Sequence, residues 1–178
     1  MPHYVLRLVL LLCVAALAGC GFSLRGTGDS ATLLPEDWKS MALVTGNPNS
    51  EFSRELVSRF ASNGVVWVDQ GEANYTLWLG PERFRQRNLS LNSEARAAEF
   101  ELTMSAEFVV RDRERAEVMS STTASVVKQM ENDPRNVVGK AEEIRLLQQE
   151  MRAELARQIM RRVGFYAATH SGATPDPT

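Results

Sequence analysis

The stretch from Glu99 to Arg111 reads EFELTMSAEFVVR, and it carries the most regular pattern in this 178-residue chain. Apolar and polar side chains alternate along it with a period of two, which is the spacing of a β-strand with one buried face. The apolar side chains that share one face are Phe100, Leu102, Met104, Ala106, Phe108 and Val110. The alternation predicts a long strand that covers a hydrophobic core on one side and presents polar groups on the other.

Further strands are expected on both sides of this one. Residues 112–116 (DRERA) form a charged turn, and Glu117–Gln129 is rich in Val and Thr, so the two long strands predict an antiparallel hairpin. Upstream, shorter apolar or alternating runs predict strands over residues 39–45, 65–68, 75–79 and 83–91. Pro81 should interrupt the sheet between the last two, because proline has no backbone N–H to donate.

Two segments carry the period of amphipathic helices. Ser50–Asn63 places Phe52, Leu56 and Phe60 four residues apart, and Gly64 supplies a stop. A much longer apolar stripe predicts a second helix over residues 136–163. The predicted fold class is therefore α+β, with two helices packed on one face of a mixed four-stranded sheet as a two-layer sandwich.

The first 19 residues are typical of a lipoprotein signal peptide. A basic end precedes an apolar run over residues 8–18, which is too short to span about 30 Å of hydrocarbon. Leu17, Ala18 and Gly19 then form the signal-peptidase recognition pattern in front of Cys20, which is the predicted lipidation site. Gly21 follows where an Asp would favour retention in the inner membrane, so we expect a lipid anchor in the outer membrane, on the periplasmic side.

The rest of the chain divides by composition. We expect residues 1–19 to be the signal peptide, 20–36 a lipidated tether rich in Gly, Ser and Thr, 37–166 a single α+β domain, and 167–178 a disordered tail.

The predicted domain contains no histidine and no cysteine, which narrows its chemistry. This composition excludes His-based and Cys-based nucleophilic catalysis and most zinc sites, so we expect no metal and no cofactor. The formal net charge of −2 argues against a nucleic-acid partner. A hydrolase that uses Glu99, Glu101 and Glu107 is the remaining enzymatic alternative, but a solvent-facing strand explains these carboxylates better, and we do not expect an enzyme.

Basic side chains are the candidate binding groups. Arg83, Arg85 and Arg87 recur at period two and therefore share one face of a strand. Guanidinium groups suit bidentate pairing with phosphate, although a solubilising strand face would give the same pattern. Lys140 opposes the helix dipole in the first turn of the long helix, which favours a ligand-binding role, and Arg96 near a strand connection could join the same patch.

The chain resembles the LptE family of lipopolysaccharide-assembly lipoproteins in several segments. They are Cys20–Gly26 (CGFSLRG), Asn47-Pro48-Asn49 with the helix that ends at Asn63-Gly64-Val65, Ala98-Glu99-Phe100, and Asn132-Asp133-Pro134 followed by Lys140 and a long helix. These segments occur in the order and at the spacing of the family, and together they span nearly all of the chain after the leader.

This resemblance implies a fold and a function. Members have two helices packed on a four-stranded sheet, and they plug the transmembrane β-barrel LptD as a 1:1 heterodimer, help it assemble and serve lipopolysaccharide transport to the cell surface. The resemblance also implies lipopolysaccharide binding by basic residues. Lys140 falls on one such family position, whereas a second appears here as Ser93, with Arg96 as the nearest cation. An accessory lipoprotein of an envelope ABC-type transporter is the alternative function.

Overall fold

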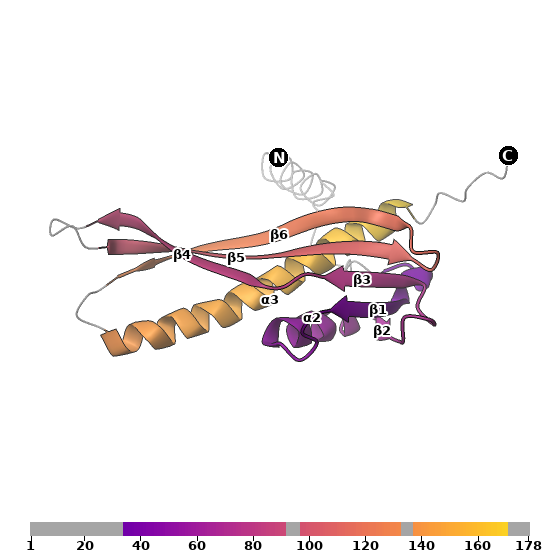
Figure 1. Cartoon of the computed structure of the whole chain (residues 1–178), viewed down its shortest axis with the longest axis horizontal. Coiled ribbons are helices and arrows are strands. Elements are labelled where there is room, and N and C mark those ends of the chain that lie inside the picture. The colour runs from indigo at the N-terminus through magenta and orange to yellow at the C-terminus, as the bar shows by residue number, and fades with distance from the viewer. Residues whose placement is uncertain (1–33, 92–96, 133–136, 171–178) are drawn as a thin grey trace, which may run out of the picture. The chain divides into compact units, whose positions relative to one another are not determined.

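Three ranges of the chain, 34–91, 97–132 and 137–170, are described by the computed structural model (Figure 1). Their elements in chain order are η1 (Glu36–Lys39), β1 (Ser40–Thr45), α2 (Glu51–Ala61), β2 (Val66–Trp67), β3 (Tyr75–Leu79), β4 (Arg83–Leu91), β5 (Ala97–Asp112), β6 (Glu117–Glu131) and α3 (Val137–His170). No helix in these ranges combines the length and the apolar character that crossing a bilayer requires.

The long strand β5 organises the sheet. β3 and β4 pair antiparallel with successive parts of one of its edges, and β6 pairs antiparallel with it as the predicted hairpin. On the other side of β3, β1 runs parallel to it, and β2 runs parallel to β1. The sheet is therefore mixed, as the sequence predicts, and α2 forms the crossover between β1 and β2.

The sheet has six strands, whereas the predicted fold class has four. All six segments are predicted as strands individually, and the count of four is wrong because the short edge strand β2 and the segment after the Gly80-Pro81-Glu82 break, β4, both join the sheet. At this break the Gly80 N–H donates to the Glu107 carbonyl over 2.8 Å. A Cβ at Gly80 would lie 3.1 Å from that oxygen, so glycine permits the close approach.

The core lies between the sheet and the two helices. All six apolar side chains of the β5 alternation are buried, which confirms that this strand has one core face. The helices contribute Phe52, Leu56 and Phe60 from α2 and Met151, Leu155, Ile159 and Val163 from α3. Figure 1 shows both helices on the same side of the sheet, and the predicted α+β class is confirmed.

Local signals fix both ends of α2. The Ser50 hydroxyl accepts the Ser53 N–H over 3.0 Å and so satisfies one of the free amides of the first turn. After the helix, Gly64 adopts φ +89°, a left-handed conformation that ends the helix at little steric cost. Between these ends the apolar stripe packs against the core, as its four-residue spacing predicts.

The folded part extends beyond the predicted boundaries at residues 37 and 166. Leu34 is already buried, and α3 continues four residues further, to His170. The helix continues because Ala167 is fully buried and the Tyr166 ring lies 5.9 Å from the Trp38 ring, so packing stabilises a turn that composition alone would leave disordered. The signal peptide, the lipidation site, the tether up to residue 33 and the tail from residue 171 lie outside the described residues.

Candidate functional site

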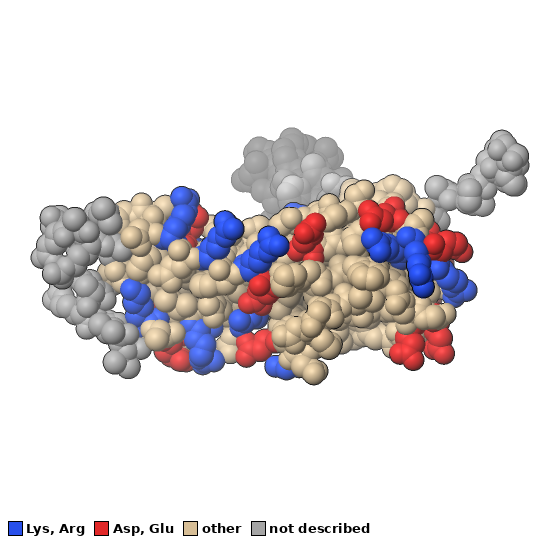
Figure 2. All heavy atoms as spheres, viewed as in Figure 1, with Lys and Arg blue, Asp and Glu red and all other residues tan. Residues whose placement is uncertain are grey.

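The three predicted arginines of β4 form a row on the face of the sheet away from the helices. Arg83, Arg85 and Arg87 lie opposite Ser105, Thr103 and Glu101 of β5, which are the polar positions of the β5 alternation. All three arginines are exposed. In Figure 2, basic side chains follow one another along the part of the surface where β4 runs in Figure 1.

The members of this row differ in their partners. Arg87 donates two hydrogen bonds to the Glu101 carboxylate, over 2.7 and 2.9 Å. These bonds hold the pKa of the Glu101 carboxyl below its ordinary value and raise the pKa of Arg87. Within the described ranges Arg83 and Arg85 make no ion pair, so they are the members available to an external anion.

Lys140 lies on the opposite side of the sheet from this row. Its ammonium donates to the Asn132 side-chain oxygen over 2.6 Å and stands 4.2 Å from the centre of the Phe100 ring. Phe100 is a core-facing residue of β5, so the sheet separates Lys140 from the arginine row. The structure therefore does not bring Lys140 and the three arginines into one patch.

Apolar side chains accompany Lys140 along α3. Ile144 and Leu147 follow it at helical spacing on the same face, and both are only half-buried against the core. Between residues 139 and 150 no side chain of α3 is fully buried, whereas Met151 and Leu155 are. A partly buried cation beside half-exposed apolar groups suits an amphiphile that carries both phosphate and acyl chains.

The other predicted site residues fall outside the described ranges. They are Arg96, the lipidation site Cys20, and the recognition residues Leu17, Ala18 and Gly19. Their roles stay predictions. Among the residues that are described, no group of three His, Cys, Asp or Glu side chains is placed to hold a metal ion.

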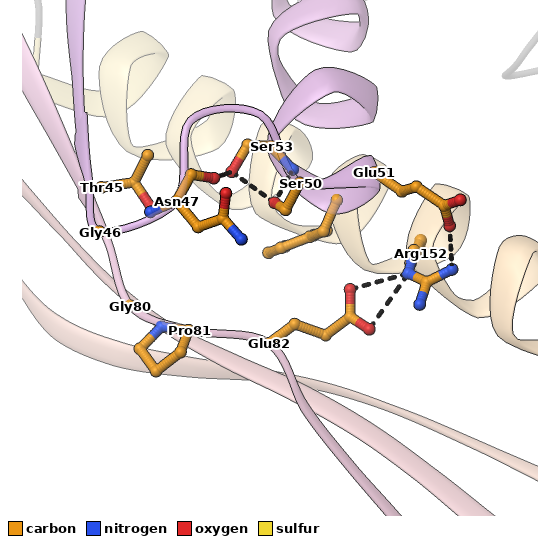
Figure 3. Close-up of a pocket in the computed structure, with 11 residues that line it drawn as sticks. Thr45, Gly46, Asn47, Ser50, Glu51, Ser53, Gly80, Pro81, Glu82 and Arg152 are labelled. Carbon is orange, nitrogen blue, oxygen red and sulfur yellow. Dashed lines mark hydrogen bonds and ion pairs between the residues drawn. The ribbon is translucent and has the colours of Figure 1, made fainter.

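Sequence reasoning missed a charged cluster that joins three elements. Arg152 of α3 binds Glu82 in the β3–β4 connection over 2.9 and 3.1 Å and also pairs with Glu51 at the start of α2. Figure 3 shows the guanidinium between the two carboxylates at the rim of a pocket of about 570 Å³, whose other walls come from Thr45–Asn47, Ser50–Ser53 and Gly80–Pro81. The hydrogen bond to Glu82 raises the pKa of Arg152, so the cluster keeps its charge.

No pattern in the sequence reveals this cluster, because its partners are 70 and 101 residues apart from Arg152. The break at Pro81, which the sequence does predict, is what turns Glu82 toward the helices. The cluster connects α2 and α3 to the sheet at the junction between β3 and β4. It therefore helps to hold the start of β4 against the two helices.

The family comparison covers most of the folded domain. The LptE family, described as lipopolysaccharide-assembly, matches residues 38–163. The chain belongs to the LptE family. A relative from Photorhabdus laumondii, named LPS-assembly lipoprotein LptE, is 28% identical over 166 residues that cover 92% of this chain and 87% of the relative. A relative of the same name from Yersinia pestis is 28% identical over 92% of this chain and 77% of its own length.

Solved structures give the same fold. The crystal structure of rare lipoprotein B from Shewanella oneidensis superposes with a TM-score of 0.66 at 26% identity, covering 74% of this LptE-family chain and 98% of that chain. The solution structure of lipoprotein B from Nitrosomonas europaea gives a TM-score of 0.68 at 21% identity, with coverage of 88% and 99%. The two-layer α+β fold is thus shared with lipoproteins of other bacteria.

Proposed function

We propose that this protein is an outer-membrane lipoprotein, acylated at Cys20 and held on the periplasmic side, whose domain plugs the LptD β-barrel as a 1:1 partner and serves lipopolysaccharide transport to the cell surface. The observation that carries this proposal is the match of the LptE family to residues 38–163, nearly the whole folded domain. The protein would act by occupying space and binding, without covalent chemistry or a cofactor.

The helix-free face of the β5–β6 hairpin supports a plug. Ser105 and Ser125 lie opposite each other on that face, followed by the pairs Thr103–Val127 and Glu101–Gln129. Ser105, Ser125 and Thr103 are small and polar, so a second surface can approach this part of the face closely, and the interior of a large transmembrane barrel is polar. We therefore assign this face to the wall of the barrel.

The surface around Lys140 supports lipopolysaccharide binding. Lys140 has no carboxylate partner among the described residues, because its two contacts are a neutral amide and an aromatic ring. A phosphate of lipid A would supply the missing anion, and Ile144 and Leu147 would meet its acyl chains. Arg83 and Arg85 are exposed on the opposite face of the sheet, so any attraction they exert on a phosphate is separate from the Lys140 surface, and salt screens it within about 10 Å at 0.1 M.

Photo-crosslinking tests which face meets the barrel. A photoreactive amino acid replaces Ser125 on the hairpin face or, as a matched exposed serine, Ser58 on α2. We expect the probe at position 125 to form an adduct with a large β-barrel protein in whole cells, and the probe at position 58 to form much less of it. An adduct from position 58 but not from position 125 would show that the assigned face is wrong.

A further inference from the structure

The last turns of α3 carry an exposed aromatic residue among arginines. Phe165 is 71% exposed, the largest exposed fraction among the large apolar residues that stand out on the described surface. It lies one turn after Arg161 and Arg162, and these three residues line a shallow groove of about 410 Å³ together with Met119, Gln158 and Tyr166. We call these six residues the α3 end patch.

The charge of this region is positive. Arg157 and Arg161 share a single carboxylate, Glu154, and Arg161 lies 3.3 Å from it. Arg162 donates to the Thr123 carbonyl over 2.8 Å, a contact that leaves its charge unneutralised. The three arginines therefore carry more positive charge than the one carboxylate of Glu154 neutralises, and both Arg157 and Arg161 are about half exposed. Favourable interaction with the helix dipole explains arginines here but does not explain an exposed phenylalanine among them.

The patch lies where the N-terminal segment joins the fold. The Trp38 ring of η1 stacks on the Tyr75 ring with 3.9 Å between the ring centres, and its centre lies 5.9 Å from that of Tyr166 in the patch. The first folded residues therefore pack on the last turns of α3. Cys20 precedes the buried Leu34 by 14 residues. Such a segment spans at most about 50 Å when fully extended and about 20 Å as a flexible coil. An acyl anchor on Cys20 would therefore keep this end of the domain within reach of the bilayer surface.

We propose that the α3 end patch is a second membrane contact, in which Phe165 enters the headgroup region and Arg161 binds phosphates of anionic phospholipids. Arginine pairs well with phosphate, and an aromatic ring beside cations is the composition that lies in a membrane interface. The contact orients the domain on the bilayer that holds its anchor. It rests on the proposed acylation of Cys20 for its location, and it is separate from the face assigned to the barrel.

A nitroxide spin label measures this contact in the acylated protein. With Cys20 acylated and Cys13 lost with the leader, Ala168→Cys, one turn beyond the patch, gives a unique labelling site that leaves Phe165 in place. The matched control is Leu146→Cys, which replaces a 48% exposed residue of the same helix about 33 Å from position 168. The measured quantity is the ratio of the label's accessibility to oxygen over its accessibility to a water-soluble nickel complex. In vesicles of phosphatidylethanolamine and phosphatidylglycerol, we expect this ratio to be at least threefold higher at position 168 than at position 146.

The double variant Phe165→Ser/Arg161→Gln should return the label at 168 to the aqueous value. Equal aqueous accessibility at 168 and 146 in protein that floats with the vesicles would overturn the proposal. A chain with Cys20→Ser tests the patch without the anchor: we expect it to bind phosphatidylglycerol vesicles at low salt and to lose at least two-thirds of that binding in the double variant but not in Leu146→Ser. Absent binding, or binding that the double variant keeps, contradicts the proposal.

The barrel partner separates the two proposals. The double variant should still co-purify with the β-barrel, because the patch lies away from the hairpin face. Loss of the barrel in this variant would make the patch a protein contact and overturn the membrane proposal while leaving the plug proposal standing. If the wild-type protein binds vesicles but never co-purifies with a barrel, the plug proposal is overturned and the membrane proposal stands.

Discussion

Leu102→Ala should lower the free energy of unfolding by about 2–5 kcal/mol, because Leu102 is fully buried at the centre of β5. The substitution removes apolar contacts and leaves a cavity between the sheet and the helices, which close packing prevents from collapsing completely. Urea denaturation followed by circular dichroism measures the effect as a lower transition midpoint with an unchanged slope.

Ser105→Ala is the matched control on the same strand. Ser105 lies on the helix-free face, opposite Arg83 and Ser125. Because this change opens no cavity, we expect the free energy of unfolding to stay within about 0.5 kcal/mol of the parent value. Similar losses for the two variants would contradict the assignment of the core to one face of β5.

Lys140→Asp should weaken lipopolysaccharide binding about tenfold or more. The substitution replaces the cation that faces the proposed phosphate by an anion, and charge-assisted hydrogen bonds contribute about 1.5–3 kcal/mol. Titration of the purified lipoprotein with labelled lipopolysaccharide at fixed salt measures the dissociation constant. Association with the barrel should be unchanged, because Lys140 lies on the helix-covered side of the sheet.

Lys140→Gln separates charge from structure. Glutamine retains a donor for the Asn132 oxygen, which Lys140 binds over 2.6 Å, but carries no charge. We expect an intermediate loss of affinity with an unchanged unfolding midpoint. Full affinity in both Lys140 variants would remove this residue from the binding site and leave Arg83 and Arg85 as the candidates.

The hydrophobic periodicity of the sequence and the positions of its glycine and proline residues predict most of the fold. The alternation over Glu99–Arg111 marks β5 and its buried face, and the strand over residues 75–79 matches β3. Pro81 marks the break between β3 and β4, and Gly64 marks the end of α2. These features are local, since each depends on the pleat of a strand, the turn of a helix or the backbone limits of one residue.

What the sequence misses depends on contacts between distant segments. The last turn of α3 begins the stretch 167–178 that is predicted as a disordered tail, and it is helical because Ala167 and Tyr166 pack against the domain. The Arg152 cluster joins residues up to 101 positions apart. Lys140 and the β4 arginines are all basic, but only the register of β4 on β5 shows that they occupy opposite faces. The proposed partner and ligand come from the family resemblance, because neither periodicity nor composition contains them.

The most direct test of the plug proposal is purification of the affinity-tagged lipoprotein from detergent-solubilised outer membranes under mild conditions. We expect one large β-barrel protein, LptD, to co-purify with it at a 1:1 ratio and to stay bound through size-exclusion chromatography. Recovery of the lipoprotein without a barrel, or with inner-membrane transporter components in its place, would show that the domain is not a barrel plug.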